Sequence, residues 1–188
     1  MVRAYTEQPV DGPVLDALLD LARRAPSAGN SQGTELLVLD QPETTERYWD
    51  VTLSQERRGH FGWPGLLLAP VLVVVWVSPD VYVVRYGEPD KAATGLGTLA
   101  DAWPVPYWFI DGGMVVDQLL LAATDAGLGA CFFGLFDHEP AVREAFDVPS
   151  AWRAVGTIAL GHPAPDRRSP SAKRPRRPLP DVVHRGAW

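Results

Sequence analysis

A run of seven apolar residues is the feature of this sequence that most restricts its fold. Residues 71–77 read VLVVVWV and lack the polar residue at every second position that a half-exposed strand shows. A strand of this kind has to be covered on both faces. The wider apolar stretch, residues 66–77, contains Pro70 and is far shorter than the ~20 residues of a membrane-spanning helix. We therefore expect a layered domain built around a buried strand, without membrane insertion.

Apolar periodicity predicts further elements around this strand. A helix is expected to begin at Asp11, which precedes a glycine and a proline, and to stop before Pro26. Other helices are expected at residues 42–58, 111–126 and 137–146, and strands at 36–39, 130–133 and 154–160. The helix at 111–126 is apolar on nearly all sides, so it should be buried, and Gly127 should end it. The 188 residues fit one domain.

Residues 79–108 have weak periodicity and five aromatic side chains. A long segment without regular structure is unusual inside a domain unless it is functional, so we interpret this one as a lid insertion. Tyr86 and Trp103 lie in its middle beside glycines, where a mobile cover could present aromatic faces to a flat substrate. Tyr82 and Trp108 adjoin predicted regular elements, so core roles are equally open for them.

Residues 163–188 are rich in proline and are predicted to form an extended C-terminal arm that lies over a surface. From Asp166 onward the arm carries seven basic and two acidic residues, a net charge of +5, whereas residues 1–165 carry a net charge of −11. The overall charge of −6 argues against general nucleic-acid binding. The arm contains three arginines whose forked guanidinium groups are suited to holding a phosphate: Arg174, Arg176 and Arg177.

Several short patterns have weak support as catalytic motifs. Gly29-Asn-Ser31-Gln-Gly33 matches the nucleophile pattern of serine hydrolases, but it follows a predicted helix and precedes a strand, the reverse of the order that chemistry needs. Cys131 lies in an apolar strand, where burial disfavours the thiolate, so a core role is favoured. The four histidines have no metal-ligand spacing. We therefore predict neither a metal site nor a dedicated catalytic side chain.

Four segments together resemble FMN-dependent nitroreductases. Residues 3–10 (RAYTEQPV) and 22–32 (ARRAPSAGNSQ) are similar in order and spacing to the opening of that family. Residues 111–129 resemble its central helix and glycine turn, and residues 161–163 (GHP) and 176–183 (RRPLPDVV) its closing segment. The resemblance implies an α+β, three-layer fold with a mixed or antiparallel sheet flanked by helices, in a homodimer with an extended C-terminal arm.

The resemblance also implies which residues bind FMN. Arg3 matches a basic residue near the ribityl and pyrimidine side of the flavin, where positive charge stabilises the negative charge that builds on reduction. Arg174 and Arg176, with Arg177 as an alternative register, match a basic pair that clamps the FMN phosphate. Two other segments line the flavin: the strand end Phe133-Gly134-Leu135, whose backbone N–H addresses flavin N5, and a loop, partly from the second subunit, with Pro26, Ser27, Ala28 and Asn30.

Departures from the family pattern concern basic residues. One or two arginines usually stand upstream of the position that matches Met1, and a lysine usually found before the second strand is replaced by Gly65 or Gly62. The implied activity is the cytoplasmic reduction of nitro compounds and quinones with NAD(P)H, by a ping-pong mechanism. A flavin-binding or flavin-sequestering protein with little turnover is the alternative, and the physiological substrate stays open.

Overall fold

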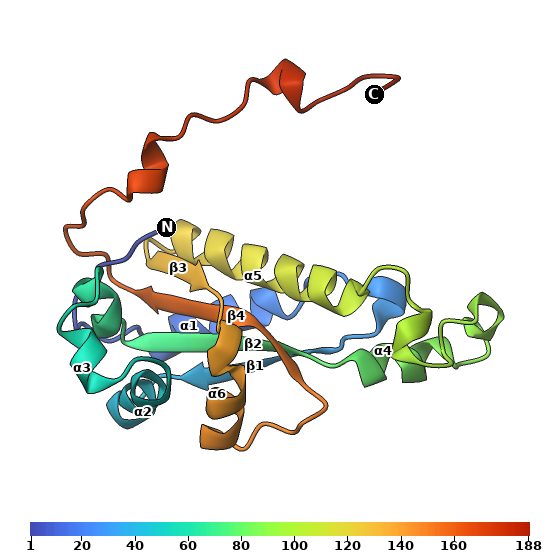
Figure 1. Cartoon of the computed structure of the whole chain (residues 1–188), viewed down its shortest axis with the longest axis horizontal. Helices are drawn as coiled ribbons and strands as arrows, with labels where there is room; N and C mark the ends of the chain where they lie inside the picture. Colours follow the sequence, from blue (N-terminus) through green and yellow to red (C-terminus); the bar gives the residue numbers. More distant parts are fainter.

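A four-stranded sheet forms the centre of the computed structural model, which describes residues 1–188 (Figure 1). The strand order is β1 (Thr34–Leu39), β2 (Val71–Val77), β4 (Arg153–Gly161) and β3 (Gly129–Phe133), and every neighbouring pair is antiparallel. The predicted α+β class is confirmed, and the sheet is antiparallel rather than mixed. None of the helices is both long and apolar enough to cross a membrane.

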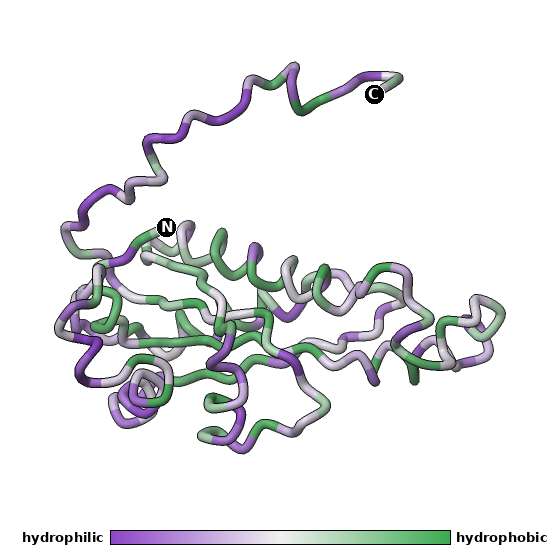
Figure 2. Tube along the Cα trace, viewed as in Figure 1, coloured by the Kyte–Doolittle hydropathy of each residue, from purple (hydrophilic) through white to green (hydrophobic).

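The central strand β2 is buried on both faces, as its sequence predicts. Val73 and Val75 belong to one apolar core, together with residues of α1 (Gly12–Ala22) and α5 (Tyr107–Asp125). Leu72 and Val74 belong to a second core on the opposite face. The apolar colour of the strand is continuous along its length (Figure 2). The sheet is therefore the middle of three layers.

Shorter helices cover the second face of the sheet. They are α2 (Pro42–Thr52) and α6 (Glu139–Ala145), which contact each other, and the short α3 (Gln55–Arg58) follows α2 and has no buried residue. Tyr48 of α2 is fully buried, and its hydroxyl lies 2.8 Å from the Thr157 hydroxyl of β4. This hydrogen bond satisfies two polar groups inside an apolar layer and fixes α2 against the sheet.

Two predicted helix starts are wrong by a few residues. Helix α5 begins at Tyr107 rather than at residue 111, because Pro106 precedes it and the apolar first turn places Trp108 in a core. Helix α6 begins at Glu139, and Asp137 lies in a separate 3-10 turn instead of capping the helix. In both places tertiary contacts, which the sequence pattern does not show, decide the boundary.

The segment 79–108 is partly regular. It starts with α4 (Pro79–Tyr86) and continues through short 3-10 turns at Ala92–Thr94 and Ala100–Ala102. Tyr82, Trp103 and Trp108 pack with Val77 in a third, small core. The Trp103 indole N–H donates to the Leu96 carbonyl at 2.9 Å. This part of the chain therefore has its own packed interior, and its movement as a lid stays a prediction.

The arm, residues 163–188, leaves the end of β4 and extends away from the rest of the chain (Figure 1). Its hydrogen bonds to the body end at Arg167, which donates to the Gly62 carbonyl. The apolar side chains that would dock it on a surface, Leu179, Val182, Val183 and Trp188, are exposed. The single chain therefore provides no surface for the outer part of the arm.

Adjacent glycines in α5 provide a matched test of the contact between this helix and the sheet. A Cβ at Gly112 would lie 2.7 Å from Val155 Cγ2 and 2.8 Å from Val77 Cγ1, whereas a Cβ at Gly113 would meet nothing within 4 Å. We expect Gly112→Ala to lower the free energy of unfolding by about 1–3 kcal/mol. Gly113→Ala should raise it by about 0.5–1 kcal/mol, because alanine favours a helix. Urea unfolding measures both, and equal effects would contradict the close contact.

Candidate functional site

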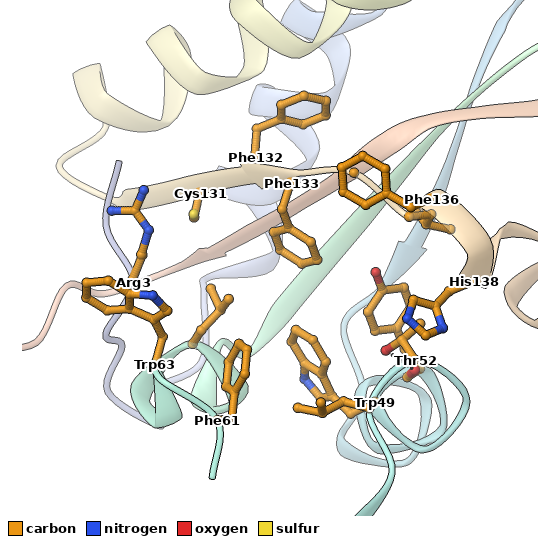
Figure 3. Close-up of a pocket in the computed structure, with 15 residues that line it drawn as sticks. Arg3, Trp49, Thr52, Phe61, Trp63, Cys131, Phe132, Phe133, Phe136 and His138 are labelled. Atoms are coloured by element: carbon orange, nitrogen blue, oxygen red, sulfur yellow. Dashed lines mark hydrogen bonds between the residues drawn. The ribbon is translucent and has the colours of Figure 1, made fainter. Parts of the chain in front are cut away.

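A cavity of about 430 Å³ opens beside the end of β3, between that strand, α2 and the turn that precedes β2 (Figure 3). Its walls are mostly aromatic and aliphatic, and its lining contains no carboxylate. The lining residues are Arg3, Tyr48, Trp49, Thr52, Leu53, Phe61, Trp63, Leu66, Cys131, Phe132, Phe133, Gly134, Leu135, Phe136 and His138. Such a cavity suits a flat, apolar ligand with an electron-rich or anionic edge.

Arg3 is the cationic group of this cavity, and backbone hydrogen bonds on both sides of it fix its position. The Val2 N–H donates to the Ala130 carbonyl of β3 at 2.9 Å, and the Tyr5 N–H donates to the Gly65 carbonyl at 3.1 Å. The Arg3 guanidinium carbon lies 5.1 Å from the centre of the Trp63 ring. None of the ion pairs in the structure involves Arg3, so its charge is available to a ligand.

Trp49 and Phe133 form a stacked pair in the wall, with ring centres 5.9 Å apart and planes 16° from parallel (Figure 3). Trp49 belongs to α2 and Phe133 ends β3, so two separate layers meet in this pair. The Trp49 indole nitrogen is buried and has no hydrogen-bond partner. A buried donor without an acceptor is costly.

The end of β3 offers further donors. The backbone N–H groups of Gly134 and Leu135 follow the last ladder residue and donate to no backbone carbonyl. Phe136, next along the chain, has a left-handed φ of 48° and is 86% exposed. Its ring covers Gly134 so closely that a Cβ there would lie 3.0 Å from it. The chain therefore presents unpaired N–H groups and an aromatic face at one rim of the cavity.

The structure brings some of the predicted flavin contacts together. Arg3 and the run Phe133-Gly134-Leu135 line the same cavity. The loop with Pro26, Ser27, Ala28 and Asn30 lies elsewhere, beside the N-terminal half of α5, where the Ala28 N–H donates to Asp111 Oδ2 at 2.8 Å. In a single chain, two groups of predicted contacts are therefore separate.

A second hollow, of about 490 Å³, joins Ala28 to Tyr86 and Trp103. Both aromatic residues were predicted to contact substrate, and their rings pack edge to face at 4.6 Å. Trp103 is only 7% exposed, so most of its surface is core. Tyr86 is half-buried and is better placed to meet a ligand in this hollow.

The predicted phosphate ligands of the arm do not reach the cavity. Arg174, Arg176 and Arg177 are exposed on the outer part of the arm (Figure 1). Arg177 donates to the Asp181 carbonyl within the arm itself. Their assignment to a phosphate stays a prediction.

Sequence reasoning missed most of the cavity wall, including Trp49, Phe61 and Phe136. It also missed Arg167, whose guanidinium carbon lies 4.5 Å from the Trp63 ring centre, on the same ring as Arg3. The aromatic residues of the Gly59–Gly65 turn are the one signal that could have indicated this wall. No local pattern could have indicated Arg167, because it is distant in sequence from the turn it contacts.

Gly65 and Gly62 are the two alternative positions for the family lysine that the resemblance implies. A Cβ at Gly65 would lie 2.8 Å from Ala4 Cβ, so the space for a side chain is already filled. A Cβ at Gly62 would lie 3.4 Å from a terminal nitrogen of Arg167. A guanidinium from the arm is therefore present where this part of the chain lacks a cation of its own.

The contacts of Ser31 and Cys131 indicate structural roles for both residues. The Ser31 hydroxyl donates to the Ala28 carbonyl at 2.6 Å, and Ser31 precedes β1 instead of joining a strand to a helix. The geometry therefore does not support a serine hydrolase. Cys131 is buried in β3, which confirms its predicted core position, and burial raises the pKa of its thiol.

The layered antiparallel fold and the aromatic, carboxylate-free cavity define a class of protein whose cavity suits a flat organic ligand. Comparison with known families identifies it: residues 1–162 match the model of the nitroreductase family. The chain belongs to this family.

Individual relatives are distant and differ in their named activities. The chain is 25% identical to the FMN reductase (NAD(P)H) of Bacillus subtilis, with 100% of this chain and 70% of that protein covered. It is 26% identical to the 5,6-dimethylbenzimidazole synthase of Rhodospirillum rubrum, over 96% and 88% of the two chains. A crystal structure from Exiguobacterium sibiricum, solved with FMN, has a TM-score of 0.75 at 19% identity and covers 97% and 91%. This last likeness supports the fold.

The Cys131 thiol should react slowly in the folded protein. Burial raises its pKa, so less thiolate is present at any given pH than in an unfolded chain, and the thiolate is the reactive form. We expect iodoacetamide at pH 8 to alkylate folded protein much more slowly than urea-unfolded protein, as followed by mass spectrometry. The unfolded chain, with its single cysteine, is the control. Equal rates would show that the thiol is open to solvent.

Proposed function

We propose that this chain is an NAD(P)H-dependent flavin oxidoreductase that uses FMN. The observation that carries the proposal is the cavity beside β3, which has aromatic walls and no carboxylate and is lined by Arg3, Gly134 and Leu135. The backbone N–H groups of Gly134 and Leu135 donate to no backbone carbonyl. Family membership supports it, as does the FMN reductase named among the relatives.

The residues of the cavity fit a flavin. When bound, FMN accepts two electrons from NAD(P)H and passes them to an oxidant. Arg3 would stabilise negative charge at the flavin edge that it meets, because its guanidinium has no carboxylate partner. The Trp49–Phe133 pair would exclude water, and the N–H groups of Gly134 and Leu135 would orient the ring. Orientation and electrostatics are therefore what this chain supplies.

The complete site requires a second copy of the chain, and we propose a homodimer. The loop at Pro26–Asn30 and the arm are both implied flavin contacts, yet neither lines the cavity of its own chain. The arm and α5 also carry exposed apolar side chains that a partner would bury, among them Ile110 and Leu121 of α5. In the dimer, each loop would meet the flavin of the other subunit.

The proposed oxidants are small electron-poor aromatics, namely nitro compounds and quinones, reduced by a ping-pong mechanism. The aromatic hollow at Tyr86 and Trp103 supports this class, because a flat substrate could rest against the half-buried Tyr86 ring beside Ala28 of the loop. Nicotinamide and oxidant would use the same place in turn. The protons that the reduction consumes would come from water, so the protein needs no dedicated acid or base.

A flavin-sequestering protein with little turnover is the second candidate. The glycines at positions 62 and 65 favour it, because the chain has no lysine at this edge of the cavity. Steady-state oxidation of NADH and NADPH with menadione or a nitrofuran separates the two candidates. Turnover that requires bound FMN supports the enzyme, and bound FMN without turnover supports sequestration.

The first test of the proposal is flavin binding. Purified protein that is supplemented with FMN and then desalted should keep the visible absorption bands of flavin. Excess FMN should also raise the melting temperature, because a ligand that binds only the folded state stabilises it. A colourless protein whose melting temperature does not respond to FMN would contradict the proposal.

A second test concerns the phosphate. Replacing both Arg174 and Arg176 by alanine should weaken FMN binding about tenfold or more, because charge-assisted hydrogen bonds to a phosphate are lost. Riboflavin lacks the phosphate, so its affinity should change little, and titration of both ligands by flavin fluorescence measures the difference. Arg185→Ala, in the same arm, is the matched control. Equal losses for FMN and riboflavin would show that these arginines do not contact the phosphate.

A further inference from the structure

The loop between α1 and β1 has an unusual backbone. Gly29, Asn30 and Gln32 all have left-handed φ angles, of 61°, 54° and 54°. Glycine and asparagine adopt left-handed geometry readily, whereas in Gln32 it persists only where the surroundings enforce it. Inside the loop, the Gln32 N–H donates to the Ser27 hydroxyl at 2.9 Å and the Ser31 hydroxyl donates to the Ala28 carbonyl at 2.6 Å. Contacts from two helices add to these bonds.

Helix α5 supplies one restraint through Asp111, which is only 2% exposed. Its Oδ2 atom accepts from the Ala28 backbone N–H at 2.8 Å and from the Tyr82 hydroxyl at 2.7 Å. None of the ion pairs in the structure involves Asp111. A buried carboxylate without a cation is costly, so these two hydrogen bonds are what keep it in place.

Helix α4 supplies the other restraints. Arg85 donates through Nε to the Gly29 carbonyl at 2.8 Å, while its terminal nitrogens hold both carboxylate oxygens of Asp90. The Tyr86 ring lies against Gly29, where a Cβ would come within 2.8 Å of it. A Cβ at Gly33 would lie 2.5 Å from the Tyr82 ring. Helix α4 therefore contacts the loop at both of its ends.

We propose that Asp111 is a positioning residue that holds the loop 27–33 in its left-handed shape and joins it to α4 through Tyr82. The hydrogen bond to Ala28 fixes the start of the loop, and the same oxygen atom fixes the tyrosine that packs against its end. The consequence for flavin affinity rests on the proposed function, because that function makes this loop a flavin contact. The restraint itself does not depend on flavin.

Hydrogen–deuterium exchange of the flavin-free protein tests the restraint directly. Asp111→Ala removes the acceptor, so amide exchange in the peptide that covers residues 25–33 should accelerate by about tenfold or more, the loss expected for a buried hydrogen bond. Asp111→Asn keeps an oxygen acceptor and should restore most of the protection. Tyr82→Phe removes one of the two donors and should give a smaller increase.

Asp16→Ala is the matched control, since Asp16 is an exposed aspartate without a side-chain hydrogen bond. Its exchange at residues 25–33 should equal that of the unmodified protein. Exchange in Asp111→Ala equal to this control would overturn the proposal. So would Asp111→Asn exchanging as fast as Asp111→Ala, because a merely structural defect is not rescued by an acceptor. If Asp111→Ala does not fold, Tyr82→Phe and Asp111→Asn still decide between these outcomes.

Flavin titration tests the consequence separately. Asp111→Ala should weaken the binding of FMN and of riboflavin by the same factor, about tenfold. The reason is that the loop is proposed to contact the flavin ring and not the phosphate, which riboflavin lacks. If the amides of the loop exchange faster in this variant but its affinity for flavin is unchanged, the link between loop order and flavin binding is overturned. If the unmodified protein binds no flavin, the proposed function fails, and the exchange experiment alone decides the role of Asp111.

Discussion

The complete burial of β2 is the constraint on which the rest of this structure depends. A strand that is apolar on both faces cannot lie at a surface, so the chain must supply two separate layers to cover it. Helices α1 and α5 form one layer, and α2 and α6 contribute to the other. The cavity lies in the second layer beside the end of β3, where Trp49 of α2 stacks on Phe133. It is therefore bounded by the sheet on one side and by α2 and its following turn on the other.

The distribution of charge explains which ligand the cavity can accept. Residues 1–165 carry a net charge of −11, yet no acidic side chain lines the cavity and Arg3 is held there without an ion-pair partner. The Arg3 guanidinium is in no ion pair, although the Arg3 backbone N–H donates to Asp166 Oδ2 at 2.9 Å. Beside N–H groups that donate to no backbone carbonyl, this guanidinium favours a ligand with negative or electron-rich atoms. The aromatic walls favour a flat one. Family membership and cavity chemistry point in the same direction.

The second group of residues, around Ala28, has the opposite electrostatic character. Here a buried carboxylate, Asp111, holds a backbone N–H and a tyrosine hydroxyl, and burial together with this hydrogen bond raises the pKa of Tyr82. Tyr82 therefore remains a donor. One region is built to leave its donors open to a ligand, and the other to satisfy its donors internally. The first is suited to binding, and the second to holding a strained loop in one shape.

Local pattern was sufficient for the strands, because burial on both faces at β2 and short apolar runs elsewhere are visible in the residues themselves. It also indicated Arg3 and residues 133–135, through motifs that resemble a known family. Other features came only from the tertiary structure. They are the helix starts at Tyr107 and Glu139, the cavity walls that Trp49 and Phe61 form, and the contact of Arg167 with Trp63. The physical reason is distance along the chain: each of these features depends on residues that meet only after the layers have packed, and local periodicity carries no information about such meetings.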